Sequence, residues 1–452
     1  MESINPATGE RAKHIPTWDD AALERAIAQV AAATPAWQAT SFGERARLLR
    51  AAAAELRANA DTYARLITLE MGKLIKEARA EVEKCAWGCE YYAEHGAAFL
   101  RDEAVATDAH KSYVAYQPLG TLLAIMPWNF PFWQAFRAAV PALMAGNTLL
   151  LKHASNVPQC ALDIEQVFER AGFPKGAFRT LLIGGAQAER LIGDARVHAV
   201  TLTGSEAAGR RVAAAAGASL KKTVLELGGS DAFVVLDDAD LDQAAAVGAV
   251  ARLQNAGQSC IAAKRFILVD AVADAFIRRF KEKLQALIPG DPMHDATTLA
   301  PMARADLRDE LHQQVLDSVR AGAELALDGG PQPGPGFFYR PVILDRVLPG
   351  TRAYQEELFG PVAIVIRARD EAHALGIAND HRYGLGGSVW TRDTARGERF
   401  ARGIVAGATF VNGMVKSDPR LPFGGVKASG YGRELSVHGI REFVNAKTVW
   451  IK

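Results

Sequence analysis

One cysteine in this sequence has the surroundings of a candidate nucleophile. Cys260 lies in the stretch GQSCIAAKR, residues 257–265, between a glycine-containing approach and two basic residues. A thiolate is a nucleophile, so this position suggests covalent catalysis. The alternative at this point is a small buried side chain, because free cysteines are among the most buried residue types.

Two further polar residues stand among apolar neighbours, where a polar side chain is costly unless it is partnered or used. Glu226, in LELGG, is flanked by leucines and precedes two glycines. Burial raises the pKa of a carboxyl group, which would make Glu226 a general base near neutral pH; the alternative is a buried ion pair. Asn129, in MPWNFPFW, is enclosed by aromatic residues and prolines that would hold its amide toward an oxyanion, unless it is only a turn residue.

A glycine turn and a lysine suggest a phosphate-containing ligand. In LTGSEAAG, residues 202–209, a strand leads through Gly204 into a helix whose first backbone N–H groups suit a pyrophosphate. Lys152 ends an apolar strand, where the carboxyl ends of parallel strands would meet a ligand crevice. A plain structural turn and a solvated lysine are the alternatives, since neither feature is specific alone.

The other cysteines, Cys85, Cys89 and Cys160, lie on apolar faces of predicted helices. Cys85 and Cys89 are one turn apart in a helix expected from about Leu74 to Leu100. A metal site there would need a second pair of ligands, which the sequence does not offer. We therefore expect buried, reduced thiols and no metal.

The elements that must position these residues change character along the chain. Residues 20–72 have apolar positions at helical spacing, behind acidic capping residues. From about Ser112, short apolar strands alternate with helices, which predicts a parallel sheet covered on both faces, and a second such series begins near residue 231. The final KTVWIK is an alternating strand without a local partner, so it should pair with a distant hairpin or another subunit.

Length and charge limit the classes of function. A chain of 452 residues is long enough for two or three domains. Its 52 Lys and Arg residues balance 51 Asp and Glu residues, which argues against a nucleic-acid-binding surface. The first residues lack the pattern of a signal peptide, and no apolar run reaches bilayer length, so we expect a cytoplasmic protein without a membrane partner.

Five motifs occur in the order typical of the aldehyde dehydrogenase superfamily, which the sequence resembles over nearly its whole length. They are PWNFP, LELGG followed by DD.DLD, GQSC, EELFGPV and PFGG.K.SG.GRE. The resemblance implies that Cys260 is the nucleophile, Glu226 the general base, and Asn129 with the backbone N–H of Cys260 the oxyanion hole. It also implies that NAD(P) is held by Trp128, Lys152, Ser155, Gly204, Ser205, Glu357 and Phe359.

The same resemblance implies an α/β fold with a Rossmann-like cofactor domain, an α/β catalytic domain and a small β oligomerisation arm, the aldehyde dehydrogenase fold. The expected boundaries are 1–95 and 119–228 for the NAD(P)-binding domain, 229–420 for the catalytic domain, and 96–118 with 433–452 for the arm. Family members assemble through such an arm, so a homodimer or homotetramer is expected.

Within the superfamily, the sequence is most similar to succinate-semialdehyde dehydrogenases. Arg137 matches an arginine that binds the substrate carboxylate in longer members, but Gln254 stands where those members have a second arginine. Arg420 with Ser417 could compensate, because arginine binds carboxylates well, and the alternative is a solvated Arg420 on the surface. A broader-specificity aldehyde dehydrogenase and a CoA-acylating enzyme are the alternatives, although CoA-acylating relatives lack a glutamate at position 226.

The implied reaction oxidises succinate semialdehyde to succinate through a thiohemiacetal and a thioester on Cys260, with NADP+ or NAD+ as hydride acceptor. Members that prefer NAD+ often have a glutamate three residues after the cofactor lysine, and here that residue is Ser155. A serine leaves room for a 2′-phosphate, toward which Lys152 and His153 would add positive charge. We therefore expect NADP+ to serve at least as well as NAD+.

Overall fold

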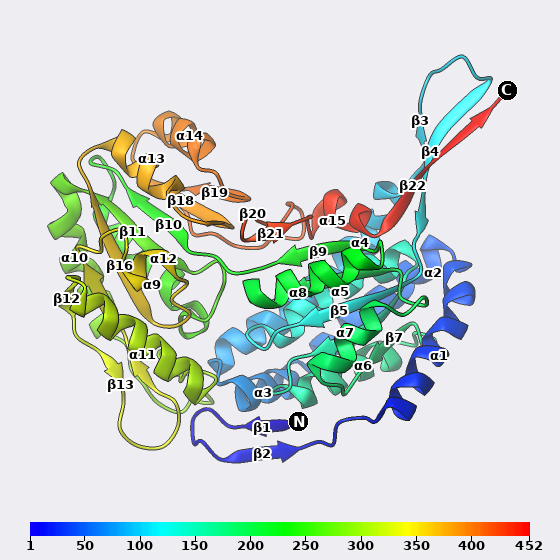
Figure 1. The fold of residues 1–452 in the computed structure, drawn as a ribbon, viewed down its shortest axis with the longest axis horizontal. Coiled ribbons are helices and arrows are strands. Elements are labelled where there is room, and N and C mark those ends of the chain that lie inside the picture. The colour runs from blue at the N-terminus through cyan, green and yellow to red at the C-terminus, as the bar shows by residue number, and fades with distance from the viewer.

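The strands expected after residue 112 form a six-stranded sheet in the computed structural model, which describes residues 1–452 (Figure 1). Its order is β21-β9-β8-β5-β6-β7. The five parallel strands are β5 (Thr121–Met126), β6 (Thr148–His153), β7 (Phe178–Thr180), β8 (Ala199–Thr203) and β9 (Lys222–Glu226). The sixth strand, β21 (Gly430–Tyr431), comes from far along the chain and pairs with β9 in antiparallel fashion, with Gly430 opposite Glu226.

Alternate residues of this sheet enter two separate cores. Leu149 and Leu151 of β6 face one core, whereas Leu150 faces the other. The first core is completed by α2 (Phe42–Ala58), α3 (Ala60–Met71), α4 (Ile75–Phe99), α5 (Pro131–Ala145) and α6 (Pro158–Arg170). The second is completed by α1 (Asp20–Gln38), α7 (Gly185–Ile192) and α8 (Glu206–Ala218). Both faces of the sheet are therefore buried, which explains the near-continuous apolar runs of its strands.

The parallel strands follow a doubly wound order. Taken in chain order, β5, β6 and β7 extend toward one edge, and β8 and β9 extend toward the other. The direction reverses between β5 and β8, and in such sheets ligands bind outside the carboxyl ends of the strands at this reversal. The segments that leave β5 and β8 carry Trp128 and Asn129 on one side and Gly204 and Ser205 on the other.

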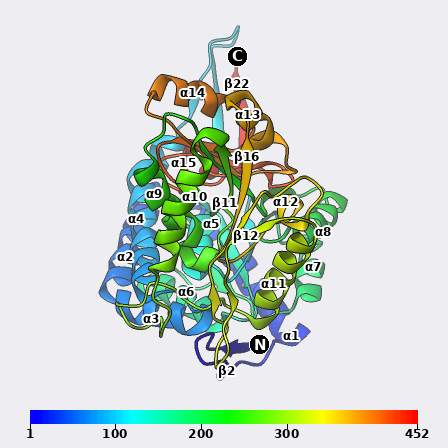
Figure 2. The same ribbon diagram turned by 90° about the vertical axis from the view of Figure 1, so that its left-hand side faces the viewer.

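A second, seven-stranded sheet follows in the order β12-β15-β16-β11-β10-β18-β19. Its strands are β10 (Asp231–Val235), β11 (Ala263–Val269), β12 (Glu324–Leu327), β15 (Val342–Asp345), β16 (Val362–Ala368), β18 (Gly386–Trp390) and β19 (Ala408–Val411). Only the edge strand β12 runs antiparallel. The helices packed around this sheet are α9 (Leu241–Leu253), α10 (Asp270–Gln285), α11 (Ala305–Arg320), α12 (Arg352–Gln355), α13 (Glu371–Asn379) and α14 (Thr394–Gly403). Figure 2 shows this second sheet from its own end of the molecule, with α9 and α10 on one side of β16 and α11 and α12 on the other.

The C-terminal strand pairs with a distant segment, as expected. β22 (Val444–Ile451) lies antiparallel to β4 (Lys111–Pro118), which also pairs with β3 (Glu103–Ala104). These strands project from the body beyond α15 (Ser436–Glu442) (Figure 1). The α/β fold and the pairing of KTVWIK with a distant strand are thereby confirmed, while the domain boundaries stay predictions.

One predicted helix differs from expectation. The helical pattern up to Gly72 is broken at Asn59, which ends α2 and precedes α3. Asn59 Nδ2 donates to the carboxylate of Glu55, and this local hydrogen bond competes with continued helix. The helix expected from Leu74 to Leu100 is confirmed as α4, with bounds Ile75–Phe99.

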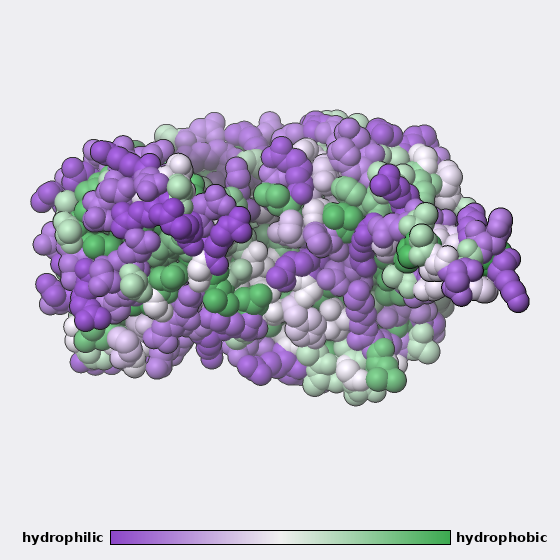
Figure 3. All heavy atoms as spheres, turned by 90° about the horizontal axis from the view of Figure 1, so that it is seen from above, coloured by the Kyte–Doolittle hydropathy of each residue, from purple (hydrophilic) through white to green (hydrophobic).

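The surface seen from above is mostly hydrophilic, with hydrophobic side chains in small groups between charged ones (Figure 3). None of the helices has both the length and the apolar composition that a membrane span requires.

Candidate active site

Cys260 follows a tight turn in left-handed backbone conformation. Asn255, Ala256 and Gly257 have φ values of 56°, 53° and 77°. Such values are costly for residues with a Cβ, so the surrounding contacts must hold the turn. Asn255 supplies two of them: its Nδ2 donates to Asn129 O at 2.7 Å, and its backbone N–H donates to Glu77 Oε1 at 3.1 Å. The turn therefore fixes where the cysteine emerges.

Cys260 lies in the wall between two cavities. One, of about 170 Å³, is bounded mainly by α4, α5 and the segment around Ser417. The other, of about 270 Å³, lies outside the carboxyl ends of β5 and β8. Burial raises the pKa of the Cys260 thiol to about 12, although the charges of Arg137 and Lys264 act in the opposite direction. The resting side chain is therefore a thiol, which needs a base to become a nucleophile.

Glu226 ends β9 as a buried carboxyl group without a hydrogen-bond partner on either oxygen. Burial raises its pKa well above the usual range, and nearby Glu434 raises it further, whereas Arg137 opposes the shift. A carboxyl group held in this way is suited to proton transfer near neutral pH. Glu226 lines neither of the two cavities. Its charged neighbours are Glu434 and Arg137, and it does not lie in the same cavity wall as Cys260.

Asn129 lies on the second cavity with its amide group fixed at both ends. Nδ2 donates to Gln258 O at 3.0 Å, and Oδ1 accepts from Gln134 Nε2 at 3.1 Å. An amide nitrogen carries two hydrogens, so the bond to Gln258 leaves one donor free. Asn129 and Cys260 are brought together at this cavity, as the sequence predicts.

The second cavity has aromatic side chains and polar groups of the kinds that a dinucleotide needs. Its lining includes Trp128, Gly204, Ser205, Gly228, Glu357 and Phe359. Ser205 caps α8 through its hydroxyl, so the N-terminal end of that helix points to the cavity rim, where anions bind favourably. The rings of Trp128 and Phe359 meet edge to face, with centroids 5.9 Å apart. The residues present therefore fit a nicotinamide dinucleotide.

Lys152 and Ser155 lie at the end of β6, outside the lining of this cavity. Lys152 is half-buried, its amine has no hydrogen-bond or ion-pair partner, and burial lowers its pKa. Ser155 is exposed. The expected positive charge of His153 is wrong: its ring is buried, its Nε2 lies 2.9 Å from Pro131 O, and desolvation lowers its pKa to about 4, so it is neutral at pH 7.

Lys264, which the sequence reading did not single out, connects the nucleophile to the cofactor side. Its Nζ donates to the carbonyl oxygens of Ser259 and Cys260 at 2.8 Å and 2.9 Å. The same Nζ lies 3.2 Å from Glu357 Oε1, which also accepts the backbone N–H of Gly229. The two basic residues that end GQSCIAAKR are the sequence feature that could have indicated Lys264. In the structure, Lys264 is buried and anchors the loop through its hydrogen bonds.

Arg137 lies on the first cavity but its charge is already paired. Its Nε is 2.5 Å from Glu434 Oε2, and its Nη2 donates to Thr203 Oγ1 at 3.0 Å. The guanidinium also stacks over the ring of Phe423, 4.7 Å from its centroid. Arg137 thus lies between the buried carboxyl groups of Glu226 and Glu434 and the first cavity.

Ser417 lines the first cavity as predicted, whereas Arg420 does not. The Arg420 side chain is 65% exposed, pairs with Asp418 at 2.7 Å and lies over Trp87. The adjacent carboxylate of Asp418 holds Arg420 outside the cavity, so Arg420 does not compensate for Gln254 and the alternative of a solvated surface arginine holds. The side chain that meets Ser417 is Lys84, whose Nζ donates to Ser417 Oγ at 2.6 Å.

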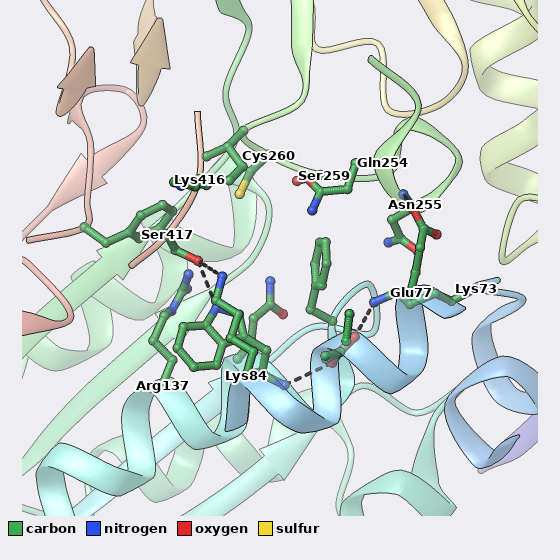
Figure 4. Close-up of a pocket in the computed structure, with 17 residues that line it drawn as sticks. Lys73, Glu77, Lys84, Arg137, Gln254, Asn255, Ser259, Cys260, Lys416 and Ser417 are labelled. Carbon is green, nitrogen blue, oxygen red and sulfur yellow. Dashed lines mark hydrogen bonds and ion pairs between the residues drawn. The ribbon is translucent and has the colours of Figure 1, made fainter. Parts of the chain in front are cut away.

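No sequence signal distinguished Lys84 from a solvated lysine on an amphipathic helix. It lies on α4 and reaches the cavity because α4 packs against α5 and the chain returns at Ser417. Figure 4 shows Lys84, Ser417 and Arg137 on one side of the cavity, with Lys73, Glu77 and Asn255 on the other.

The remaining cysteines are buried free thiols. Burial raises the pKa of Cys85, Cys89 and Cys160, so each is protonated at neutral pH. No group of three or more His, Cys, Asp or Glu side chains is arranged to hold a metal ion. Cys260 is the one cysteine in contact with a cavity described above.

The chain is similar over its whole length to aldehyde dehydrogenases of known sequence and structure. The aldehyde dehydrogenase family matches residues 1–449. The chain is 51% identical over 451 residues to a probable succinate-semialdehyde dehydrogenase [NADP(+)] of Synechocystis sp., covering 100% of this chain and 99% of that protein. It is 52% identical over 455 residues to a succinate-semialdehyde dehydrogenase [NADP(+)] of Mycolicibacterium paratuberculosis, covering 100% and 96%. Succinic semialdehyde dehydrogenase from Streptococcus pyogenes, solved with NADP+, superposes with a TM-score of 0.98 at 38% identity, covering 100% and 99%.

Proposed function

The chain belongs to the aldehyde dehydrogenase family, and from that premise we propose that it oxidises succinate semialdehyde to succinate with NADP+. The observation that carries the proposal is the position of Cys260 between two cavities, one suited to a dinucleotide and one with cationic side chains. Relatives about half identical over the full chain are named for this substrate and cofactor.

The proposed first step is attack of the Cys260 sulfur on the aldehyde carbon. The thiol proton passes to solvent as the C–S bond forms, because the pKa of the thiol is far above neutrality. The carbonyl oxygen becomes an oxyanion, which the free Nδ2 hydrogen of Asn129 and the backbone N–H of Cys260 would stabilise. The product of this step is a thiohemiacetal on Cys260.

When bound, the nicotinamide group supplies the acceptor for the hydride that leaves the thiohemiacetal. Trp128, Ser205, Glu357 and Phe359 would hold the dinucleotide in the second cavity. Lys264 keeps the Cys260 loop at a fixed distance from Glu357 while this happens. The sulfur is then left as a thioester.

Hydrolysis of the thioester needs a base for water. Glu226 is proposed for this role because its raised pKa suits it to accept a proton. To reach the water, its side chain would have to turn from Glu434 toward Cys260, and no hydrogen bond to its oxygens opposes this turn. A CoA-acylating enzyme would have no use for a carboxyl group prepared in this way.

NADP+ is proposed as the preferred cofactor, with NAD+ as a weaker substitute. Ser155 is exposed and small, and the amine of Lys152 has no partner, so a 2′-phosphate would meet a hydroxyl and one positive charge. His153 contributes nothing to this preference because it is neutral.

The chain is also proposed to form a homodimer or homotetramer through the β arm, which presents exposed Trp450 and Ile451. The cytoplasmic location stays a prediction. The test of the proposed function is kcat/KM for succinate semialdehyde against butanal, which differ chiefly by the carboxylate, with NADP+ and NAD+ and with or without CoA. Preference for butanal, or a requirement for CoA, would contradict it.

A further inference from the structure

Lys84 is the charged side chain of the first cavity whose surroundings leave it available to a ligand. Within the same cavity, Lys73 is buried in an ion pair with Glu81, and Arg137 is paired with Glu434. Lys84 has no acidic partner within ion-pair distance. Lys416 also has none, but it is exposed at the edge of the cavity.

The amine of Lys84 is held in place by neutral groups. Its Nζ lies 2.6 Å from Ser417 Oγ and 4.5 Å from the centroid of the Trp133 ring. Ser417 Oγ also accepts Trp133 Nε1 at 3.1 Å. An ammonium has three donors and a hydroxyl has one, so this arrangement keeps two donors of Lys84 and the hydroxyl hydrogen of Ser417 for a ligand.

Arg137 is less suited than Lys84 to bind the carboxylate of the substrate. Its Nε faces Glu434 and its Nη2 faces Thr203, so a second carboxylate would compete with Glu434 for the same cation. Breaking that pair would leave Glu434 charged and buried beside Glu226, which is costly. The position where a second arginine is expected holds Gln254, which is neutral.

We propose that Lys84 Nζ and Ser417 Oγ bind the distal carboxylate of the substrate, so that Lys84 determines the selectivity for aldehydes that carry an acid group. This inference rests on the proposed function, since it names the residue that reads the carboxylate. Lys84 acts in substrate binding and takes no part in the steps at the sulfur.

The electrostatics of the site agree with this role. Burial, and after it the charge of Arg137, lower the pKa of Lys84 to about 8, while Cys85, Glu81 and Asp418 act in the opposite direction. A buried ammonium without a counter-ion gains most from a bound anion, because the anion restores the interactions that burial removed.

The experiment compares Lys84→Met, Lys84→Arg and the wild type on succinate semialdehyde and butanal. Lys84→Met should raise KM for succinate semialdehyde about 10- to 150-fold, by the usual worth of hydrogen bonds to charged groups, with kcat changed less than about threefold. Butanal kinetics should stay within about threefold of wild type. Lys84→Arg should recover part of the lost affinity. Equal losses on both aldehydes, or no loss on either, would overturn the inference.

Matched controls separate this inference from the proposed function. Lys76→Met removes a lysine from the exposed side of α4, and Lys416→Met removes the other unpaired cation of the cavity. Neither should change the preference for succinate semialdehyde, and a loss confined to Lys416→Met would overturn the role of Lys84. If wild type shows no preference for succinate semialdehyde over butanal, the proposed function fails. If the preference exists and Lys84→Met keeps it, only the inference fails.

A binding measurement keeps the inference testable should turnover be lost. Succinate should inhibit butanal oxidation by wild type competitively and should inhibit Lys84→Met at least tenfold more weakly. Thermal unfolding of each variant reports whether it folds. A folded Lys84→Met that binds succinate as wild type does would contradict the assignment.

Discussion

Lys264 Nζ lies 3.2 Å from Glu357 Oε1, and this ion pair connects the loop of the candidate nucleophile to the wall of the dinucleotide cavity. The same ammonium donates to the carbonyl oxygen of Cys260. Burial lowers the pKa of Lys264, and Glu357 acts to raise it. A ligand that moves the carboxylate of Glu357 would therefore also move Lys264, and with it the backbone of Cys260.

Lys264→Met should lower kcat about 10- to 150-fold for both aldehydes, because charged hydrogen bonds contribute roughly 1.5–3 kcal/mol. Alkylation of Cys260 by iodoacetamide checks the cause. NADP+ should change the alkylation rate of wild type and leave that of the variant nearly constant. An unchanged kcat would mean that the loop keeps its place without this ammonium.

Cys260→Ala should abolish aldehyde oxidation, whereas Glu226→Gln should still form some thioester. The amide cannot take a proton from water, so hydrolysis slows while acylation continues. Rapid-quench mass spectrometry of the Glu226→Gln enzyme should show the acyl group on Cys260. Turnover of this variant at the wild-type rate would exclude Glu226 as the deacylation base.

Arg137→Ala should weaken oxidation of both aldehydes and destabilise the fold. The resemblance implies that Arg137 binds the substrate carboxylate, which would make the loss much smaller for butanal, but the ion pair with Glu434 changes this expectation. Removing one partner of a buried pair costs about 3–5 kcal/mol, because the other charge remains buried. Urea unfolding at pH 7 measures this cost. A stable variant with selective loss on succinate semialdehyde would restore the earlier expectation.

Ser155→Glu should shift cofactor preference toward NAD+ by about tenfold or more, because a carboxylate would repel the 2′-phosphate of NADP+. The measurement is kcat/KM for the two cofactors at one aldehyde concentration, with Ser155→Ala as the uncharged control. A wild type that uses NAD+ far more efficiently than NADP+ would contradict the argument from this position.

The pH dependence of KM should reflect Lys84, whose pKa is lowered to about 8 mainly by burial. As the pH rises through this value, the ammonium loses its proton, so binding of the acid weakens. KM for succinate semialdehyde should rise about fivefold from pH 8 to pH 9. Arg137, Glu81, Cys85 and Asp418 surround Lys84, and butanal, which has no carboxylate for Lys84 to bind, is the control for any other group that changes charge. A flat profile for succinate semialdehyde would contradict the assignment.

The sequence predicted those parts of the molecule that depend on local pattern. The alternation of strands and helices and the helix Ile75–Phe99 follow from periodicity, whereas the meeting of Cys260 with Asn129 follows from the family resemblance. Apolar runs and glycine turns carry this information because both faces of the sheets are buried.

Side chains whose role depends on a distant partner were missed or misplaced. Lys84 reaches Ser417 across 333 positions of the chain, and nothing near it in the sequence indicates that contact. Arg420 was expected in the cavity, but Asp418, two residues away, holds it outside. His153 was expected to be charged, but burial against Pro131 makes it neutral.

The pairing of Gly430 with Glu226 also has a consequence for how the chain is made. The edge of β9 that carries Glu226 stays open during synthesis until residues 430–431 leave the ribosome, on the order of tens of seconds later. Leu225 and Glu226 are thus exposed as an unpaired strand edge in every nascent chain, which is a site for aggregation. The same delay means that a truncated product cannot complete the sheet, so activity appears only in chains translated nearly to their end.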